Sequence, residues 1–222
     1  MNIPRLALKE MTTELLFHEI VTAVPAAYDA AVFAAYYHRN DLRGPRGKVA
    51  RDPYIAHPYR VALRNIRWGI SDELTAIGGC LHDVFEDHAQ DIERETGVRA
   101  DKHLINTFGT EAWNLVEQLS NPPGRQTPEE YRSKVVSRWG NIRVFAVKNS
   151  DLKDNALSLR HTPGPRRGRL ARKYEPLAEP AMERLRQPDA LEFYGAYGQE
   201  QALLAWENGL PLLRLYTQER EA

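Results

Sequence analysis

Apolar residues recur at helical spacing along nearly the whole chain, and no stretch alternates apolar and polar residues long enough to indicate a sheet. The Ala-rich segment 26–38 predicts one helix. Pro58 suits the first helical position, so a second helix is expected from there to about Trp68. Ser71 is the expected N-cap of a third helix, which continues to about Asp87. The pattern therefore predicts an all-α fold.

Capping and turn residues divide the second half of the chain in the same way. Thr127–Glu130 has the spacing of a capping box, which predicts a helix that reaches about Trp139. A long helix is expected from Ile142 to about Leu159. Residues 161–172 combine prolines, glycines and arginines, which favours a loop with a basic rim. A further helix is expected from about residue 170 or 172 to 186, although two prolines interrupt it.

The overall composition is that of an ordinary globular protein and limits the classes of function. Basic and acidic residues number 30 each among 222 residues, so the net charge of zero argues against nonspecific coating of nucleic acid. Cys80 is the only cysteine, which excludes an intrachain disulfide and a cysteine-based zinc site. No apolar stretch is long enough for a membrane span, and we expect a cytoplasmic protein. One domain over residues 1–222 is the simplest organisation.

The segment Leu81–Asp87 places one histidine close to three acidic residues. On a continuous helix these four side chains would fall within an arc of about 140°; they are His82, Asp83, Glu86 and Asp87. An imidazole and three carboxylates on one face suit a divalent metal ion, although a solvated acidic surface would have the same spacing. Adjacent ligands cannot complete a coordination sphere, so others must come from different helices.

Two residues elsewhere in the chain are candidates for the missing ligands. His57 stands at an expected helix start, and Asp151 lies in a helix whose apolar neighbours indicate burial. Imidazole and carboxylate ligands together suit Mn²⁺, Fe²⁺ or Zn²⁺. Each residue also has an ordinary structural interpretation, His57 as a packed or capping histidine and Asp151 as a helix-surface acid.

Three sequence elements, taken in order, resemble those of a known family. They are Pro-Tyr-Ile-Ala-His-Pro at 53–58, Leu-His-Asp-Val-Phe-Glu-Asp at 81–87, and Val-Lys-Asn-Ser-Asp at 147–151 with Asn155 four residues further on. This set resembles the HD-superfamily hydrolases, and more narrowly the hydrolase domain of RelA/SpoT homologues and the stand-alone small alarmone hydrolases. The motif-bearing core would cover about residues 26–160, with a helical extension over about 170–222.

The resemblance implies a single-domain HD-type helical bundle and a specific reaction. One Mn²⁺, or another divalent metal ion, would be held by His57, His82, Asp83 and Asp151. The implied activity is removal of the 3′-pyrophosphate from guanosine tetra- or pentaphosphate, which yields GDP or GTP and pyrophosphate. The remaining site residues that we expect are the catalytic pair Glu86 and Asp87, with Lys48, Arg51 and Asn155 as substrate-binding residues.

The chain also departs from the family pattern at several positions. Lys48 stands where arginine is usual, His88 stands where threonine is usual, and Leu152–Asp154 replaces an Arg-Leu-His sequence. These changes concern the pocket lining more than the metal ligands. Another HD phosphohydrolase acting on a different nucleotide ester therefore remains an alternative, as does a nucleotide-binding HD protein with little turnover. The arginines at 160–172 fit a phosphate pocket or ordinary solvation better than a nucleic-acid surface, and the oligomeric state stays open.

Overall fold

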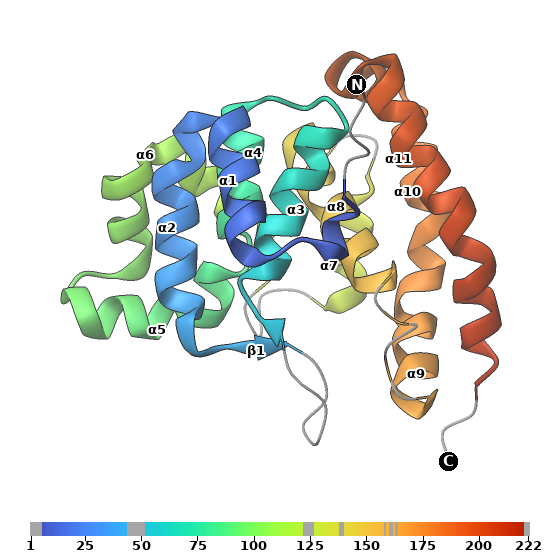
Figure 1. Cartoon of the computed structure of the whole chain (residues 1–222), viewed down its shortest axis with the longest axis horizontal. Helices are drawn as coiled ribbons and strands as arrows, with labels where there is room; N and C mark the ends of the chain where they lie inside the picture. Colours follow the sequence, from blue (N-terminus) through green and yellow to red (C-terminus); the bar gives the residue numbers. More distant parts are fainter. Residues whose placement is uncertain are drawn as a thin grey trace. The chain divides into compact units, whose positions relative to one another are not determined.

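The computed structural model describes residues 6–43, 52–121, 127–137, 140–157, 159, 162 and 164–219 (Figure 1). Helices make up nearly all of this described part, and a two-stranded ladder is the only sheet in it, so the predicted all-α class is confirmed. The chain separates into two compact units. The first unit comprises Met1–Ile66 and Ser71–Ser120, and the second unit comprises Arg67–Ile70 and Asn121–Ala222. The single-domain organisation stays a prediction.

The first unit is built from short helices around an apolar core (Figure 1). Its described helices and strands are η1 (Leu8–Glu10), α1 (Thr13–Ala23), η2 (Pro25–Ala27), α2 (Tyr28–Tyr37), η3 (His38–Asn40), β1 (Leu42–Arg43), β2 (Asp52–Pro53), α3 (Ala56–Arg67, whose last residue belongs to the second unit), α4 (Glu73–Leu81), α5 (Val84–Thr96) and α6 (Ala100–Leu119). The strands β1 and β2 pair antiparallel, with Leu42 opposite Pro53.

Small residues let the helices of the first unit approach closely. Ala30, Ala31 and Ala34 on α2 are fully buried, and α2 packs against α4. A Cβ atom added at Gly79 would lie 2.8 Å from the Cα atom of Ala62, so α4 touches the backbone of α3 at this point. Because a larger residue would separate the two helices, Gly79 holds the end of α4 beside α3.

The segment around Leu81–Asp87 differs from the predicted continuous helix. Asp72, and not Ser71, is the N-cap of α4, since its carboxylate accepts a hydrogen bond from the backbone of Thr75 at 2.8 Å. The helix ends at Leu81 and α5 begins at Val84, so His82 and Asp83 occupy the junction. The prediction of one helix through these two residues is wrong, and α5 continues well beyond Asp87.

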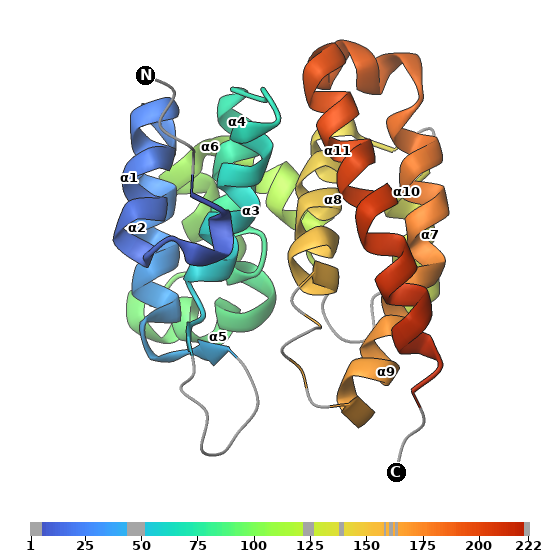
Figure 2. The ribbon, with the colours of Figure 1, turned by 45° about the vertical axis from the view of Figure 1, so that its right-hand side comes forward.

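The second unit is a helical bundle that contains the long helix α11 (Figure 2). Its described elements are α7 (Pro128–Val135), α8 (Ile142–Leu157), α9 (Gly164–Tyr174), η5 (Glu175–Leu177), α10 (Ala178–Leu185) and α11 (Pro188–Thr217). The capping box that begins α7 is confirmed: the backbone of Thr127 donates to Glu130, and the backbone of Glu130 donates to Thr127. In Figure 2, α11 runs alongside α9 and α10.

The predicted basic loop at 161–172 is wrong for the part that the structure describes, because α9 begins at Gly164. Its prolines do not prevent this, since Pro165 lies in the first turn, where a missing N–H is tolerated. The buried Ala171 and Tyr174 give the helix an apolar face that packs against α11. The expected helix up to residue 186 is also divided in two, with Pro176 in the intervening 3₁₀ turn η5.

Candidate functional site

Three of the predicted metal ligands lie close together in the first unit. His57 is in the first turn of α3, and His82 and Asp83 form the junction between α4 and α5. The Nε2 atoms of His57 and His82 are 3.7 Å and 3.1 Å from the Oδ2 atom of Asp83. One ligand atom from each residue falls within 4.8 Å of the other two. We call these three residues the first cluster.

Neighbouring groups fix the orientation of the first cluster. The Nδ1 atom of His82 is 2.9 Å from the carbonyl oxygen of Gly79, so an N–H there donates to this oxygen and turns Nε2 towards Asp83. The hydroxyl of Tyr54 donates to the Oδ2 atom of Asp83 at 2.7 Å. Asp83 is the N-cap of α5 and yet makes no capping hydrogen bond with its side chain, which contacts Tyr54 and His82.

Glu86 and Asp87 follow in the first turn of α5. Partial burial, with the negative charges of Asp83 and Glu86, raises the pKa of Asp87 to about 6. A carboxyl group with such a pKa exchanges protons near neutral pH, as a general acid or base must. Burial and the nearby Asp83 also raise the pKa of Tyr54, which keeps its hydroxyl protonated as a donor.

A pocket of about 410 Å³ opens beside this arrangement. Both Tyr54 and Asp87 line it, so it borders the hydrogen-bond partner of Asp83 and the carboxyl group with the raised pKa. The full lining consists of Asn40, Asp41, Leu42, Tyr54, Asp87 and His88.

Asp151 and Asn155 lie together on α8 in the second unit. The side-chain amide of Asn155 donates to the Oδ1 atom of Asp151 at 2.7 Å, and the Nζ atom of Lys148 is 3.4 Å from Oδ2. Asp151 is therefore a buried, hydrogen-bonded carboxylate, as its apolar sequence neighbours indicated. Its assignment as the fourth metal ligand remains a prediction, and so does the contact of Asn155 with a nucleoside. Lys48 and Arg51 lie outside the described residues.

One departure from the family pattern has a structural explanation. Lys153 is 1% exposed, and its Nζ atom lies 4.3 Å from the centre of the Trp206 ring. The indole N–H of Trp206 donates to the side-chain oxygen of Asn149 at 2.7 Å. The cation–π contact places Lys153 in the packing between α8 and α11, so this departure concerns the core of the second unit.

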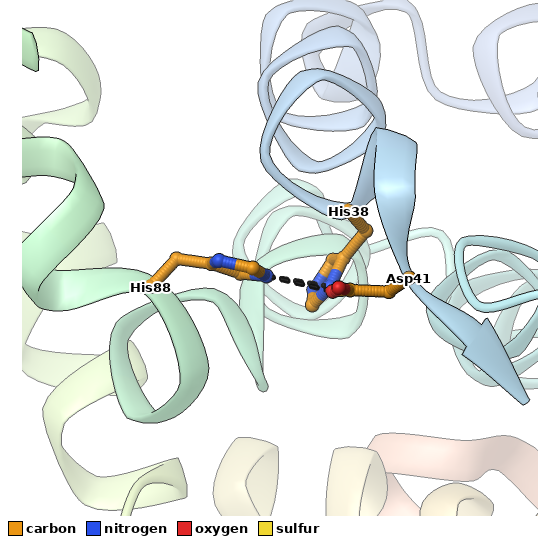
Figure 3. Close-up of side chains that lie close together, drawn as sticks. All are labelled: His38, Asp41 and His88. Atoms are coloured by element: carbon orange, nitrogen blue, oxygen red, sulfur yellow. Dashed lines mark hydrogen bonds and ion pairs between the residues drawn. The ribbon is translucent and has the colours of Figure 1, made fainter.

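A second group of histidines and carboxylates in the first unit was not predicted. His38 in η3, Asp41 just after it, and His88 on α5 bring ligand atoms within 4.8 Å of one another (Figure 3). We call these residues the second cluster. His88 is visible in the sequence only as a departure from the family pattern, and nothing in the sequence joins it to residues 47 and 50 positions earlier.

Burial and hydrogen bonding have opposite effects on the pKa values of the second cluster. Burial lowers the pKa of His38, which favours the neutral imidazole. For Asp41, burial acts to raise the pKa, but hydrogen bonds with His38 and His88 outweigh it and hold the pKa below its usual value. Hydrogen bonds with His88 and Arg94 likewise lower the pKa of Asp91, the next acidic residue along α5.

The donors of the first cluster fit a divalent metal ion. Two imidazoles and one carboxylate are ligands that Mn²⁺, Fe²⁺ and Zn²⁺ share. The other ring nitrogen of His82 faces the carbonyl group of Gly79, and metal-binding histidines typically have such a hydrogen bond. Tyr54 supports the carboxylate in the same way.

Comparison with known proteins gives relatives of one kind. The chain is 27% identical over 165 residues to a "GTP pyrophosphokinase" of Myxococcus xanthus, covering 67% of this chain and 20% of the relative. It is 29% identical over 160 residues to a "Probable guanosine-3′,5′-bis(diphosphate) 3′-pyrophosphohydrolase" of Synechocystis sp., covering 68% of this chain and 20% of the relative. The "Bifunctional (p)ppGpp synthase/hydrolase SpoT" of Escherichia coli K12 is 27% identical over 179 residues, which cover 74% of this chain and 24% of that protein.

The chain resembles the RelA/SpoT-type hydrolases. It spans only about a fifth to a quarter of the length of these curated RelA/SpoT relatives. A solved structure described as a metazoan ortholog of SpoT that hydrolyzes ppGpp has the same fold, with a TM-score of 0.59 and 21% identity. The match covers 83% of this chain and 96% of that one. No family model matches the chain, and none of the described helices is long and apolar enough to cross a membrane.

Proposed function

We propose that this protein is a metal-dependent pyrophosphohydrolase acting on a guanosine tetra- or pentaphosphate-like alarmone. The reaction would remove the 3′-pyrophosphate and release pyrophosphate with GDP or GTP. The observation that carries this proposal is the convergence of His57, His82 and Asp83. Glu86 and Asp87 follow Asp83 in the first turn of α5. The names of several relatives refer to the same kind of substrate.

His57, His82 and Asp83, with Asp151 as a fourth ligand, would hold the metal ion in this proposal, and Mn²⁺ is the ion we favour. A divalent ion lowers the pKa of bound water and neutralises charge on phosphate oxygens. The chain contributes the fixed geometry: Gly79 sets the orientation of the His82 ring, and Tyr54 holds the Asp83 carboxylate. Such supporting contacts keep the ligands aimed at one point before the ion binds.

Glu86 and Asp87 would handle the proton of the attacking water. Both belong to the first turn of α5, directly after the Asp83 ligand. The raised pKa of Asp87, about 6, lets its carboxylate accept a proton near neutral pH and release it again. Glu86 is exposed on the same turn and would orient the water or share this task.

The substrate would be bound by residues outside the metal site. Asn155, whose amide hydrogen-bonds to Asp151, would hydrogen-bond to the nucleoside. Lys48 and Arg51 would contact phosphate oxygens, although a lysine lacks the bidentate geometry of arginine. A small nucleotide is thus the proposed partner. A cytoplasmic location, expected from the composition, belongs to the same proposal.

A panel of 3′- and 5′-phosphorylated nucleotides, incubated with the protein and Mn²⁺ and resolved by chromatography, tests this function. We expect turnover of nucleotides that carry a 3′-pyrophosphate, with pyrophosphate as product. Preference for nucleotides phosphorylated only at the 5′ position would favour the alternative HD phosphohydrolase. Binding of metal and nucleotide without any turnover would instead indicate a sensor.

A further inference from the structure

The second cluster brings three ligand atoms into a small triangle at the edge of the pocket (Figure 3). The Oδ2 atom of Asp41 lies 2.8 Å from Nδ1 of His38 and 2.8 Å from Nε2 of His88. The two histidine nitrogens are 3.1 Å apart. Both histidines are buried, at 1% and 8% exposure, so bulk water does not separate these atoms.

The protonation of the two rings decides which contacts of the triangle are hydrogen bonds. If both nitrogens carry hydrogens, each can donate to the Oδ2 atom of Asp41 at 2.8 Å. If both nitrogens are unprotonated, a cation beside the triangle can instead accept a lone pair from each of the three atoms.

The size of the triangle indicates which coordination geometry would fit. Ligand atoms about 2.1 Å from a metal ion are about 3.0 Å apart at neighbouring octahedral positions and about 3.4 Å apart in a tetrahedron. The observed separations of 2.8 to 3.1 Å match the octahedral value. Two histidines and one carboxylate on one face of an octahedron leave three positions open.

We propose that His38, Asp41 and His88 form a second divalent-cation site, suited to an octahedral ion such as Mn²⁺, Fe²⁺ or Co²⁺. Asp41 and His88 line the pocket, together with Tyr54 and Asp87, so the open positions can take water or an anionic oxygen there. The site shares no ligand with the first cluster and does not depend on the proposed function.

Asp91 supports this assignment as a positioning residue. Its Oδ2 atom lies 2.9 Å from Nδ1 of His88, so a hydrogen on Nδ1 can donate to Asp91 and leave the lone pair of Nε2 for a cation beside Asp41. Arg94 holds the other oxygen of Asp91. Metal-binding histidines often have a carboxylate hydrogen-bonded in this way to the ring nitrogen that does not bind the metal ion. For His38, Nε2 has no hydrogen-bond partner among the described residues, so its polar contacts lie on the Nδ1 side, within the cluster.

Metal stoichiometry measured by equilibrium dialysis against Mn²⁺ or Co²⁺, with elemental analysis, tests the second site. The Asp83→Asn variant removes a ligand of the first cluster and isolates the second. We expect one ion per chain in Asp83→Asn and none in Asp83→Asn/His88→Thr. As a matched control, His18 is an exposed histidine outside both clusters, so Asp83→Asn/His18→Ala should still bind one ion.

A milder variant tests the site even if His88→Thr fails to fold. Asp83→Asn/Asp91→Asn keeps all three ligands, and loss of the supporting carboxylate should weaken metal binding about 10- to 100-fold. Metal affinity unchanged by both His88→Thr and Asp91→Asn would overturn the second site. If Asp83→Asn binds as many ions as the wild type and His88→Thr removes one, the second site stands and the metal centre of the proposed function fails.

Discussion

The first and second clusters have the same ligand types and yet differ in how the chain builds them. In the first cluster, His82 and Asp83 are adjacent in sequence and the break between α4 and α5 turns them towards His57. In the second cluster, His38 lies in η3 and Asp41 directly follows it, while His88 comes from α5, 50 residues after His38. Both clusters thus depend on packing between separate elements: the junction of α4 and α5 faces α3 in the first, and α5 faces the end of η3 in the second.

The supporting contacts of the two clusters differ as well. A backbone carbonyl orients His82, so that contact does not depend on a further side chain. A carboxylate orients His88, and that contact requires Asp91 to stay ionised. Tyr54 touches both groups, because its hydroxyl donates to Asp83 and its ring lies 4.8 Å from the ring of His38. The clusters therefore share no ligand, and Tyr54 is a neighbour of both.

The largest expected effect is the loss of turnover in a variant that lacks one ligand of the first cluster. Asp83→Asn should lower turnover more than about 100-fold, since loss of a direct ligand costs more than loss of a supporting residue. Steady-state kinetics on the guanosine 3′-pyrophosphate substrate, with metal analysis of the purified variant, checks this. Asp29→Asn changes an exposed aspartate of α2 and serves as the control. Full activity in metal-free Asp83→Asn protein would contradict the mechanism.

Glu86→Gln should separate metal binding from proton transfer. The variant keeps every proposed ligand, so we expect an unchanged metal content with a value of kcat lowered about 100-fold, the usual contribution of a general acid or base. Metal analysis and initial rates on the same preparation measure both quantities. A variant that loses its metal along with its rate would place Glu86 among the ligands instead.

Tyr54→Phe should affect one cluster and spare the other. The change removes the 2.7 Å hydrogen bond to Asp83 and leaves the ring beside His38 in place. The affinity of the first cluster for Mn²⁺ should fall about 10-fold, while the second binding constant stays the same. Calorimetric titration of the wild type and the variant resolves the two constants. Equal losses at both would show that the clusters are coupled.

The smallest expected effect concerns the pH dependence of stability. Folding favours the protonated form of Asp87, because the pKa of this side chain is raised to about 6 in the folded protein. The resulting stabilisation of the metal-free protein is fully present below the pKa of the unfolded state and is lost as the pH rises through about 6. Above that pH, the charged carboxylate lowers the free energy of unfolding. Asp87→Asn should therefore raise the Tm by about 2 °C at pH 7 and less at pH 5. Thermal unfolding of metal-free protein at both pH values measures this; an equal shift at each would contradict the raised pKa.

The spacing of residues in the sequence predicts the all-α class and the His82–Asp83 pair of the first cluster, because both depend on local signals. Capping residues and apolar periodicity are local signals, which is why α7 and α8 begin where predicted. The break at His82 and Asp83 was missed because both residues keep helical backbone angles while the helix axis changes. The helix α9 was missed because its stability comes from packing on α11, which overrides its prolines and glycines.

The second cluster could not be found from sequence, since η3 and α5 meet only after folding. His88 alone was visible, as an unusual residue after Glu86 and Asp87. Its partner Asp41 lies at the end of a short 3₁₀ turn that no periodic pattern marks.

Product analysis with guanosine 3′,5′-bis(diphosphate) as the only nucleotide tests the central claim most directly. The protein, supplied with Mn²⁺, should convert it to GDP and pyrophosphate in equal amounts, and Asp83→Asn should leave it intact. Both products can be quantified over a time course by ion-exchange chromatography. Release of orthophosphate without pyrophosphate by the wild type would contradict the proposed reaction.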